Sequence, residues 1–102
     1  MLRIEATFES AKKKEFASHL IDRAEKAGYK VSAVYLSGEY DIFLHKEQDK
    51  VIMRVRIDSP YKPKNAKLSY LSYLEVEGFD EQSLYIVTEV MKTAFIRFDF
   101  AI

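Results

Sequence analysis

Cysteine is absent from the 102-residue sequence, which excludes disulfide bonds, thiolate nucleophiles and cysteine-ligated metals. No run approaches the roughly 18 apolar residues of a membrane span, and the N-terminal stretch MLRIEATFES, charged at Arg3 and Glu5, does not resemble a secretory signal. Sixteen basic residues balance sixteen acidic ones, so the overall basic field typical of nucleic-acid-binding proteins is also missing. These absences predict a cytoplasmic protein that does not associate with membranes.

The residues that are present suffice for one folded domain. Hydrophobic residues make up 48% of the chain and include seven phenylalanines and seven tyrosines, so we expect a core rather than disorder. At this length the core belongs to a single domain spanning residues 1–102. Asparagine and glutamine are scarce while lysine and glutamate are abundant, a composition that leans towards a heat-adapted source.

The first third of the chain predicts one strand and one helix. Residues 2–8 alternate between apolar and polar side chains, as in a half-buried strand. Across residues 11–27, apolar side chains such as Phe16 and Leu20 repeat at helical spacing, and Gly28 ends the pattern.

Four strands are predicted in the middle of the chain. Residues 30–47 form a hairpin with Gly38 at its turn. Two further strands at 51–58 and 68–77 are separated by a loop at 59–67, which holds both prolines. Alternation places the residues of 51–58 on two faces, with Val51, Met53, Val55 and Ile57 inward and Ile52, Arg54, Arg56 and Asp58 outward.

The last segment begins with Asp80 as a helix N-cap. From Leu84 onwards the apolar residues fall on one helical face, so we predict one long helix that continues to Ile102. The tail FIRFDFAI also alternates as a strand does, and a terminal strand is the alternative. The helix is preferred because no glycine, asparagine or proline separates the two patterns.

The predicted order is strand, helix, four strands and helix, and antiparallel hairpins dominate it. It predicts an α+β fold with two helices on one face of an antiparallel sheet, and the other face is left to meet solvent, a ligand or another chain. Across the whole chain this order resembles a single repeat of the TATA-binding-protein-like fold and, more loosely, the helix-grip fold of lipid-binding domains. The first resemblance implies a concave sheet face that contacts DNA or a partner. The second implies a long C-terminal helix that closes a cavity.

The sequence predicts no catalytic, cofactor-binding or metal site, and therefore a non-enzymatic protein. His19 and His45 are the only imidazoles, and they lie on different predicted elements outside any metal-ligand spacing. The three glycines form neither a P-loop nor a dinucleotide-binding loop. A group of carboxylates matches no cation-binding loop and is interpreted as solvated charge: Glu75, Glu77, Asp80 and Glu81.

Two basic clusters support nucleic-acid binding as an alternative function. Lysines at a helix N-terminus can join backbone N–H groups around a phosphate, and a loop of lysines with a tyrosine can neutralise phosphates and stack on a base. Three adjacent helical residues point about 100° apart, however, so the first cluster cannot form one pocket. The clusters are Lys12, Lys13 and Lys14 in the helix and Tyr61, Lys62, Lys64 and Lys67 in the loop.

Our first hypothesis is self-association through the open sheet face, because symmetric homodimers are the commonest oligomers. Aromatic residues and arginine are enriched in interface cores, and exposed apolar patches mark contacts. The predicted interface residues are Phe43, Ile52, Arg54, Arg56 and Tyr73. A third hypothesis is a cavity for an apolar small molecule between the C-terminal helix and the sheet, lined by Phe95, Phe98, Tyr70 and Tyr40.

Overall fold

A computed structural model describes residues 2–47, 50–58, 71–78, 81–93 and 99–100. The chain is an α+β protein, as the order of its elements predicts. The elements are β1 (Leu2–Glu9), the 3-10 turn η1 (Ser10–Lys12), α1 (Lys13–Lys26), β2 (Lys30–Leu36), β3 (Glu39–Lys46), β4 (Lys50–Ile57), β5 (Leu71–Gly78), α2 (Glu81–Thr93) and β6 (Asp99–Phe100).

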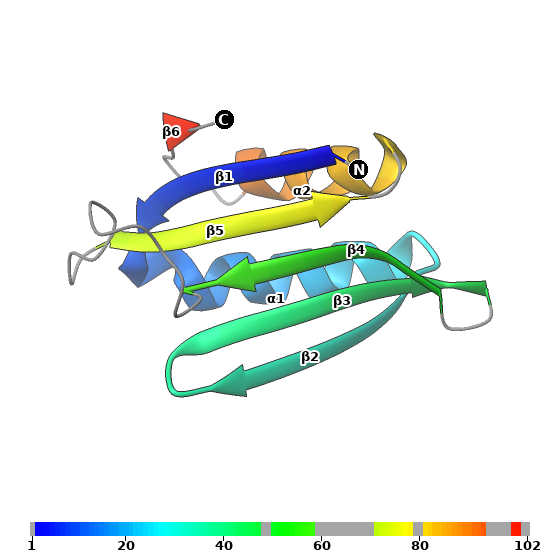
Figure 1. Ribbon diagram of the computed structural model, residues 1–102, viewed down its shortest axis with the longest axis horizontal. Coiled ribbons are helices and arrows are strands. Elements are labelled where there is room, and N and C mark those ends of the chain that lie inside the picture. Colours follow the sequence, from blue (N-terminus) through cyan, green and yellow to red (C-terminus); the bar gives the residue numbers. More distant parts are fainter. Residues whose placement is uncertain (1, 48–49, 59–70, 79–80, 94–98, 101–102) are drawn as a thin grey trace.

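The strands form one antiparallel sheet in the order β2-β3-β4-β5-β1-β6. Strands β2 to β5 are a simple meander, and β1 lies beside β5 although the two are far apart in sequence. Both helices lie behind the sheet in Figure 1, on the same face, and they pack against each other. We call the covered side the inner face and the opposite side the outer face.

The hydrophobic core lies between the inner face and the helices. Phe16 and Leu20 of α1 are buried against the sheet, and the Phe16 ring lies 5.7 Å from the Phe8 ring of β1, centroid to centroid. Each fully buried side chain of this size contributes about 1.5–3 kcal/mol relative to exposure. The strand residues that complete the core include Ala6, Ile42, Leu44, Met53, Val55, Ile57, Leu74 and Val76.

A β-bulge interrupts the pairing of β3 with β4. Leu44 is opposite Met53, but His45 is opposite Val51, so Ile52 is the extra residue of the bulge. Ile52 is only 6% exposed and belongs to the core. The prediction that Ile52 faces outward is therefore wrong, because a bulge changes the alternation of side chains along one strand.

The prediction of one helix from Leu84 to Ile102 is also wrong. Helix α2 ends at Thr93, and residues 99–100 form β6, which pairs with Ala6 and Thr7 of β1. The edge of β1 presents N–H and C=O groups that require partners. Backbone pairing there outweighs the helical periodicity of the tail. The predicted loop at 59–67 lies outside the described residues, as do residues 68–70 of the predicted strand.

The turn between β2 and β3 has the predicted position. Ser37 has φ 54° and Gly38 has φ 80°, so both central residues adopt the left-handed conformation that a two-residue type I′ hairpin requires. The ammonium of Lys13 donates a hydrogen bond to the Gly38 carbonyl oxygen at 2.7 Å. This bond ties the hairpin tip to the start of α1.

Candidate interaction surfaces

Strand β2 carries a run of exposed apolar side chains. Val34 is 57% exposed, Tyr35 61% and Leu36 71%. Within the described ranges the only other large hydrophobic side chain so exposed is Tyr85, on α2. Three consecutive exposed apolar residues on one strand are unusual for a surface in contact with water alone, and such patches commonly mark contacts.

The position of β2 in the sheet explains this exposure. It is an edge strand, paired only with β3 in the part of the chain that the structure describes. Only Val31 packs against the core, while the Tyr35 ring lies 4.5 Å from the Tyr40 ring, centroid to centroid. The other edge of the sheet differs, because β6 pairs there with part of β1. Among the described residues, the edge of β2 that faces away from β3 therefore combines backbone groups without a strand partner and exposed apolar side chains.

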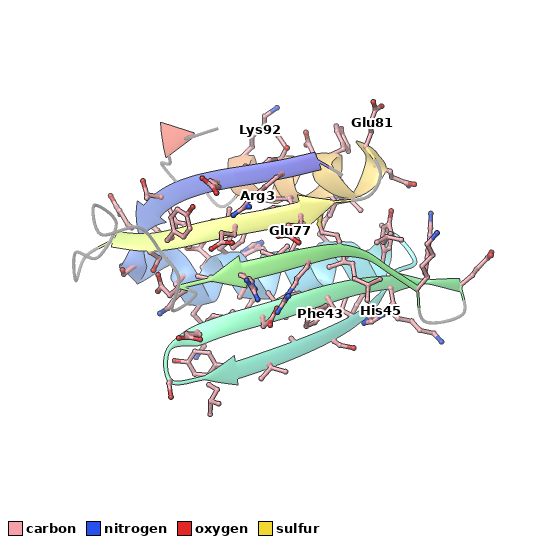
Figure 2. The ribbon with its side chains drawn as sticks, viewed as in Figure 1. Arg3, Phe43, His45, Glu77, Glu81 and Lys92 are labelled. Carbon is pink, nitrogen blue, oxygen red and sulfur yellow. The ribbon has the colours of Figure 1, made fainter. Side chains whose placement is uncertain are left out.

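Charged side chains cover much of the outer face. Figure 2 shows Arg3, Phe43, His45 and Glu77 on this side of the sheet, away from the helices. Arg3 forms ion pairs with Glu5 at 2.9 Å and with the buried Glu75 at 3.3 Å. Opposite charges on neighbouring strands stabilise a sheet by about 0.2–1 kcal/mol per pair.

A second ion pair on the outer face joins β4 to β3. The Arg54 guanidinium donates two hydrogen bonds to the Asp41 carboxylate, at 2.9 and 2.7 Å, and its carbon lies 4.9 Å above the Phe43 ring centroid. The hydrogen bonds to Asp41 raise the pKa of Arg54, although partial burial opposes them. Arg54 therefore stays charged and covers one side of Phe43.

The five residues predicted as an interface do not form one exposed apolar patch. Ile52 lies in the core, and Tyr73, although on the outer face, is only 5% exposed. Phe43 and Arg54 are half-buried and contact each other. Arg56 is half-buried as well, and the register places it between Asp41 and Glu75.

The buried residue Tyr73 provides a test of the outer face at alkaline pH. Burial, followed by the charge of Glu5 and a hydrogen bond to that carboxylate, raises the pKa of Tyr73 to about 12 from 10.0. Tyrosine exposed on unfolding ionises near pH 10. The contribution of un-ionised Tyr73 to the stability of the fold is therefore fully present below pH 10, and it is lost as the pH rises towards 12.

We therefore expect the stability of the native chain to fall more steeply between pH 10 and pH 12 than that of Tyr73→Phe. Urea unfolding at half-unit pH steps measures the difference, and Tyr85→Phe, at an exposed tyrosine, is the control and should behave as the native chain does. Parallel curves for the native chain and Tyr73→Phe contradict the assignment.

A polar cluster links four elements near the hairpin turn. Asp58, directly after β4, accepts hydrogen bonds from Lys13 at 3.0 Å, from the Ser72 hydroxyl at 2.9 Å and from the Tyr73 backbone N–H at 2.9 Å. The Ser72 hydroxyl also lies 3.1 Å from that of Ser10. Burial by itself raises the pKa of Asp58, but these hydrogen bonds and the charge of Lys13 outweigh it and lower the pKa. We interpret this Asp58 cluster as a structural clamp.

The first basic cluster does not act as a unit. Lys12 pairs with Glu15 at 3.5 Å, Lys13 pairs with Asp58, and Lys14 is exposed. This divergence agrees with the 100° rotation between successive helical residues. The second predicted cluster, made of Tyr61, Lys62, Lys64 and Lys67, lies outside the described residues.

The remaining candidate residues are scattered. His19 is exposed on α1, and His45 is half-buried on the outer face. Of the carboxylates, Glu75 is buried, Glu77 is half-buried and Glu81 is exposed. No group of three or more side chains suited to hold a metal ion occurs among the residues described. Asp80, Tyr70, Phe95 and Phe98 lie outside those residues, whereas Tyr40 packs against the core.

The sequence matches no protein-family model and no curated protein, so comparison assigns the chain to no family. Neither helix, over the residues described, has the length and apolarity needed to cross a membrane.

Sequence reasoning missed the exposed edge of β2. The signal present was weak: Val34 and Leu36 on one face and Val31 and Tyr35 on the other make both faces of this strand partly apolar. Such a pattern also describes a strand buried on both faces.

Proposed function

We propose that the protein is a non-enzymatic interaction module that self-associates through the edge of its sheet formed by β2. The observation that carries this proposal is the run of exposed apolar side chains Val34, Tyr35 and Leu36 on the free edge strand. Edge strands that expose both backbone groups and apolar side chains are templates for pairing with another chain. Self-association then removes the apolar patch from water.

The contact is placed at the β2 edge rather than over the middle of the outer face. There, arginines already pair with carboxylates of the same chain, as Arg3 does with Glu5 and Arg54 with Asp41. Covering such pairs removes their hydration, and the attraction between the charges does not always offset that loss. Phe43 lies on the strand next to β2 and extends the proposed surface inward from the edge.

Nucleic-acid binding has less support from the described residues, because Lys12 and Lys13 are engaged within the chain. The resemblance to a single TATA-binding-protein-like repeat stays a prediction, and the meander β2 to β5 with β1 beside β5 is compatible with it. A salt titration separates the two functions, since binding to phosphates weakens steeply as salt rises. An apolar contact between copies does not weaken in this way.

The test is the oligomeric state of the native chain and of a double variant, Val34→Thr with Leu36→Thr. We expect light scattering to show a dimer whose dissociation constant rises at least about tenfold in the variant, which corresponds to about 1.4 kcal/mol of lost contact. Threonine retains β propensity at these exposed positions, so the fold should be unaffected.

Tyr85→Thr is the matched control, because Tyr85 is equally exposed but lies on α2. It should leave the dissociation constant unchanged. A native chain that remains monomeric at millimolar concentration, or a double variant that associates as the native chain does, would rule out the proposal.

A further inference from the structure

We infer that β2 pairs antiparallel with β2 of a second copy about a twofold axis at Ala33, so that the two sheets become one continuous sheet. This inference rests on the proposed self-association and specifies its geometry. It is argued from the hydrogen-bonding pattern of the hairpin, from the side chains of β2 and from the contrast between the two edges of the sheet.

The hairpin determines which backbone groups of β2 face the free edge. A two-residue turn at Ser37-Gly38 closes on the pair Leu36 and Glu39, and the closing pair of such a hairpin is hydrogen-bonded. Pairs in an antiparallel ladder alternate between hydrogen-bonded and non-hydrogen-bonded. The N–H and C=O groups that point away from β3 therefore belong to three residues, Val31, Ala33 and Tyr35.

Ala33, the central one of these three residues, sets the register of the pairing between the two β2 strands. If Ala33 is opposite Ala33 of the second copy, then Val31 is opposite Tyr35 and Tyr35 is opposite Val31. All the outward-facing backbone groups of both strands then find partners. A register shifted by two positions leaves one of these residues opposite the turn or beyond the end of the strand, so it forms a shorter ladder.

The side chains of β2 are compatible with this register. On the inner face, the exposed Tyr35 ring would cover Val31 of the second copy, and two alanines would meet at the axis. On the outer face, Val34 would lie opposite Ser32, and Lys30 opposite Leu36. Aromatic and β-branched neighbours across strands stabilise a ladder.

The charges are complementary as well. Lys30 is the one charged residue in β2, and in this register it does not meet its own copy. The same outer-face row continues from Leu36 to Glu39 of the second copy, because Leu36 and Glu39 pair within each hairpin. Glu39 stands two strands from Lys30, about 10 Å away between backbones. A lysine stem can lie over Leu36 and bring its ammonium to that carboxylate.

The contrast between the two edges favours a second copy as the occupant. Natural edge strands are usually protected by proline, a central charge or a bulge, and β2 carries none of these between Lys30 and Leu36. At the other edge β6 pairs with β1, so that the chain covers part of that edge itself. The edge of β2 lacks these protective features, and its residues match those of a second β2 related by a twofold axis. Another copy of the same strand is therefore the partner that fits it.

Charge substitutions at Ala33 test the axis, because only the residue on the axis meets itself. Ala33 is exposed, so a charge there should not disturb the fold. We expect Ala33→Lys and Ala33→Glu each to raise the dissociation constant of the dimer at least tenfold. We expect a 1:1 mixture of the two to recover dimers, detected as the mixed mass by native mass spectrometry.

Cysteine substitution gives an independent readout, because the native chain contains no cysteine. Ala33→Cys should form a disulfide-linked dimer on oxidation, since facing residues of a hydrogen-bonded pair lie about 5.5 Å apart at Cα, within the range of a disulfide. His19→Cys, exposed on α1, is the control and should form far less of this species.

The outcomes separate the inference from the proposed function. A native chain that never dimerises overturns both. A native dimer in which the mixture fails to recover association and Ala33→Cys does not cross-link overturns only the β2 pairing. If Val34→Lys and Val34→Glu show the mutual rescue instead, the axis is not at Ala33 and this register is wrong.

Discussion

Replacing Asp58 with alanine is expected to lower the free energy of unfolding by about 3 kcal/mol. The carboxylate has a side chain only 14% exposed, and it accepts hydrogen bonds from Lys13, Ser72 and the Tyr73 backbone. Its removal leaves these donors without that acceptor and leaves a partly buried ammonium without its counter-charge. Asp58 also has φ 58°, a left-handed conformation that aspartate tolerates better than alanine does.

Urea unfolding at pH 7 measures this loss, with Asp22→Ala as the control. Asp22 also pairs with a lysine, Lys26 at 2.9 Å, but both side chains are well exposed on α1. An exposed pair four residues apart on a helix is worth only about 0.3–0.5 kcal/mol. Equal losses for Asp58→Ala and Asp22→Ala would contradict the role assigned to the Asp58 cluster.

The same cluster implies a dependence on acid. Because the pKa of Asp58 is lowered from 3.8 in the folded state, its stabilisation is fully present well above pH 3.8. It is lost as the pH falls through 3.8 towards the folded-state pKa. Asp58→Asn retains an acceptor oxygen but no titrating carboxylate, so the stability difference from the native chain should shrink as the pH falls below about 4.

The second large effect is expected at Ile52, where replacement by alanine should cost about 3 kcal/mol. Ile52 is 6% exposed and packs in the core because of the bulge between β3 and β4. Removing a buried branched side chain loses its transfer free energy and leaves a cavity. If simple alternation held, Ile52 would face outward, and its truncation would change stability by no more than about 0.5 kcal/mol.

Val51→Ala is the matched control, because alternation and the bulge predict opposite results for the two neighbours. Val51 is half-buried opposite His45, and its truncation should cost about 1 kcal/mol or less. Chemical unfolding of the two variants under one set of conditions ranks them. A larger loss for Val51→Ala than for Ile52→Ala would place the bulge elsewhere.

Much of the secondary structure follows from local periodicity. The alternation in residues 2–8, the helical spacing after residue 11 and the turn at Ser37-Gly38 correspond to β1, α1 and the β2–β3 hairpin. These patterns predict the elements correctly because the spacing of apolar residues along one segment shows which side of that helix or strand is buried. The α+β class then follows from the order of the elements.

Local periodicity predicted the candidate interaction surface less well than the secondary structure. The predicted interface required Ile52 and Tyr73 to be exposed, and both are buried. A single extra residue in a strand is invisible to a pattern of period two until its partner strand is known. The exposure of Val34 and Leu36 likewise depends on β2 being an edge strand, which follows from the order of all strands in the sheet.

By itself, the sequence determined the types of most elements, their approximate bounds and the apolar side of most of them, because these depend on interactions between residues close in the chain. Tertiary structure alone decided three features: the inward turn of Ile52, the end of α2 at Thr93 with β6 on β1, and the free edge of β2. Each depends on how the strands pair with one another in the sheet, which the pattern within a single segment does not show. Backbone pairing at a strand edge can outweigh the periodicity of the local sequence, as it does where β6 pairs with β1. A strand edge without such pairing can pair with another chain.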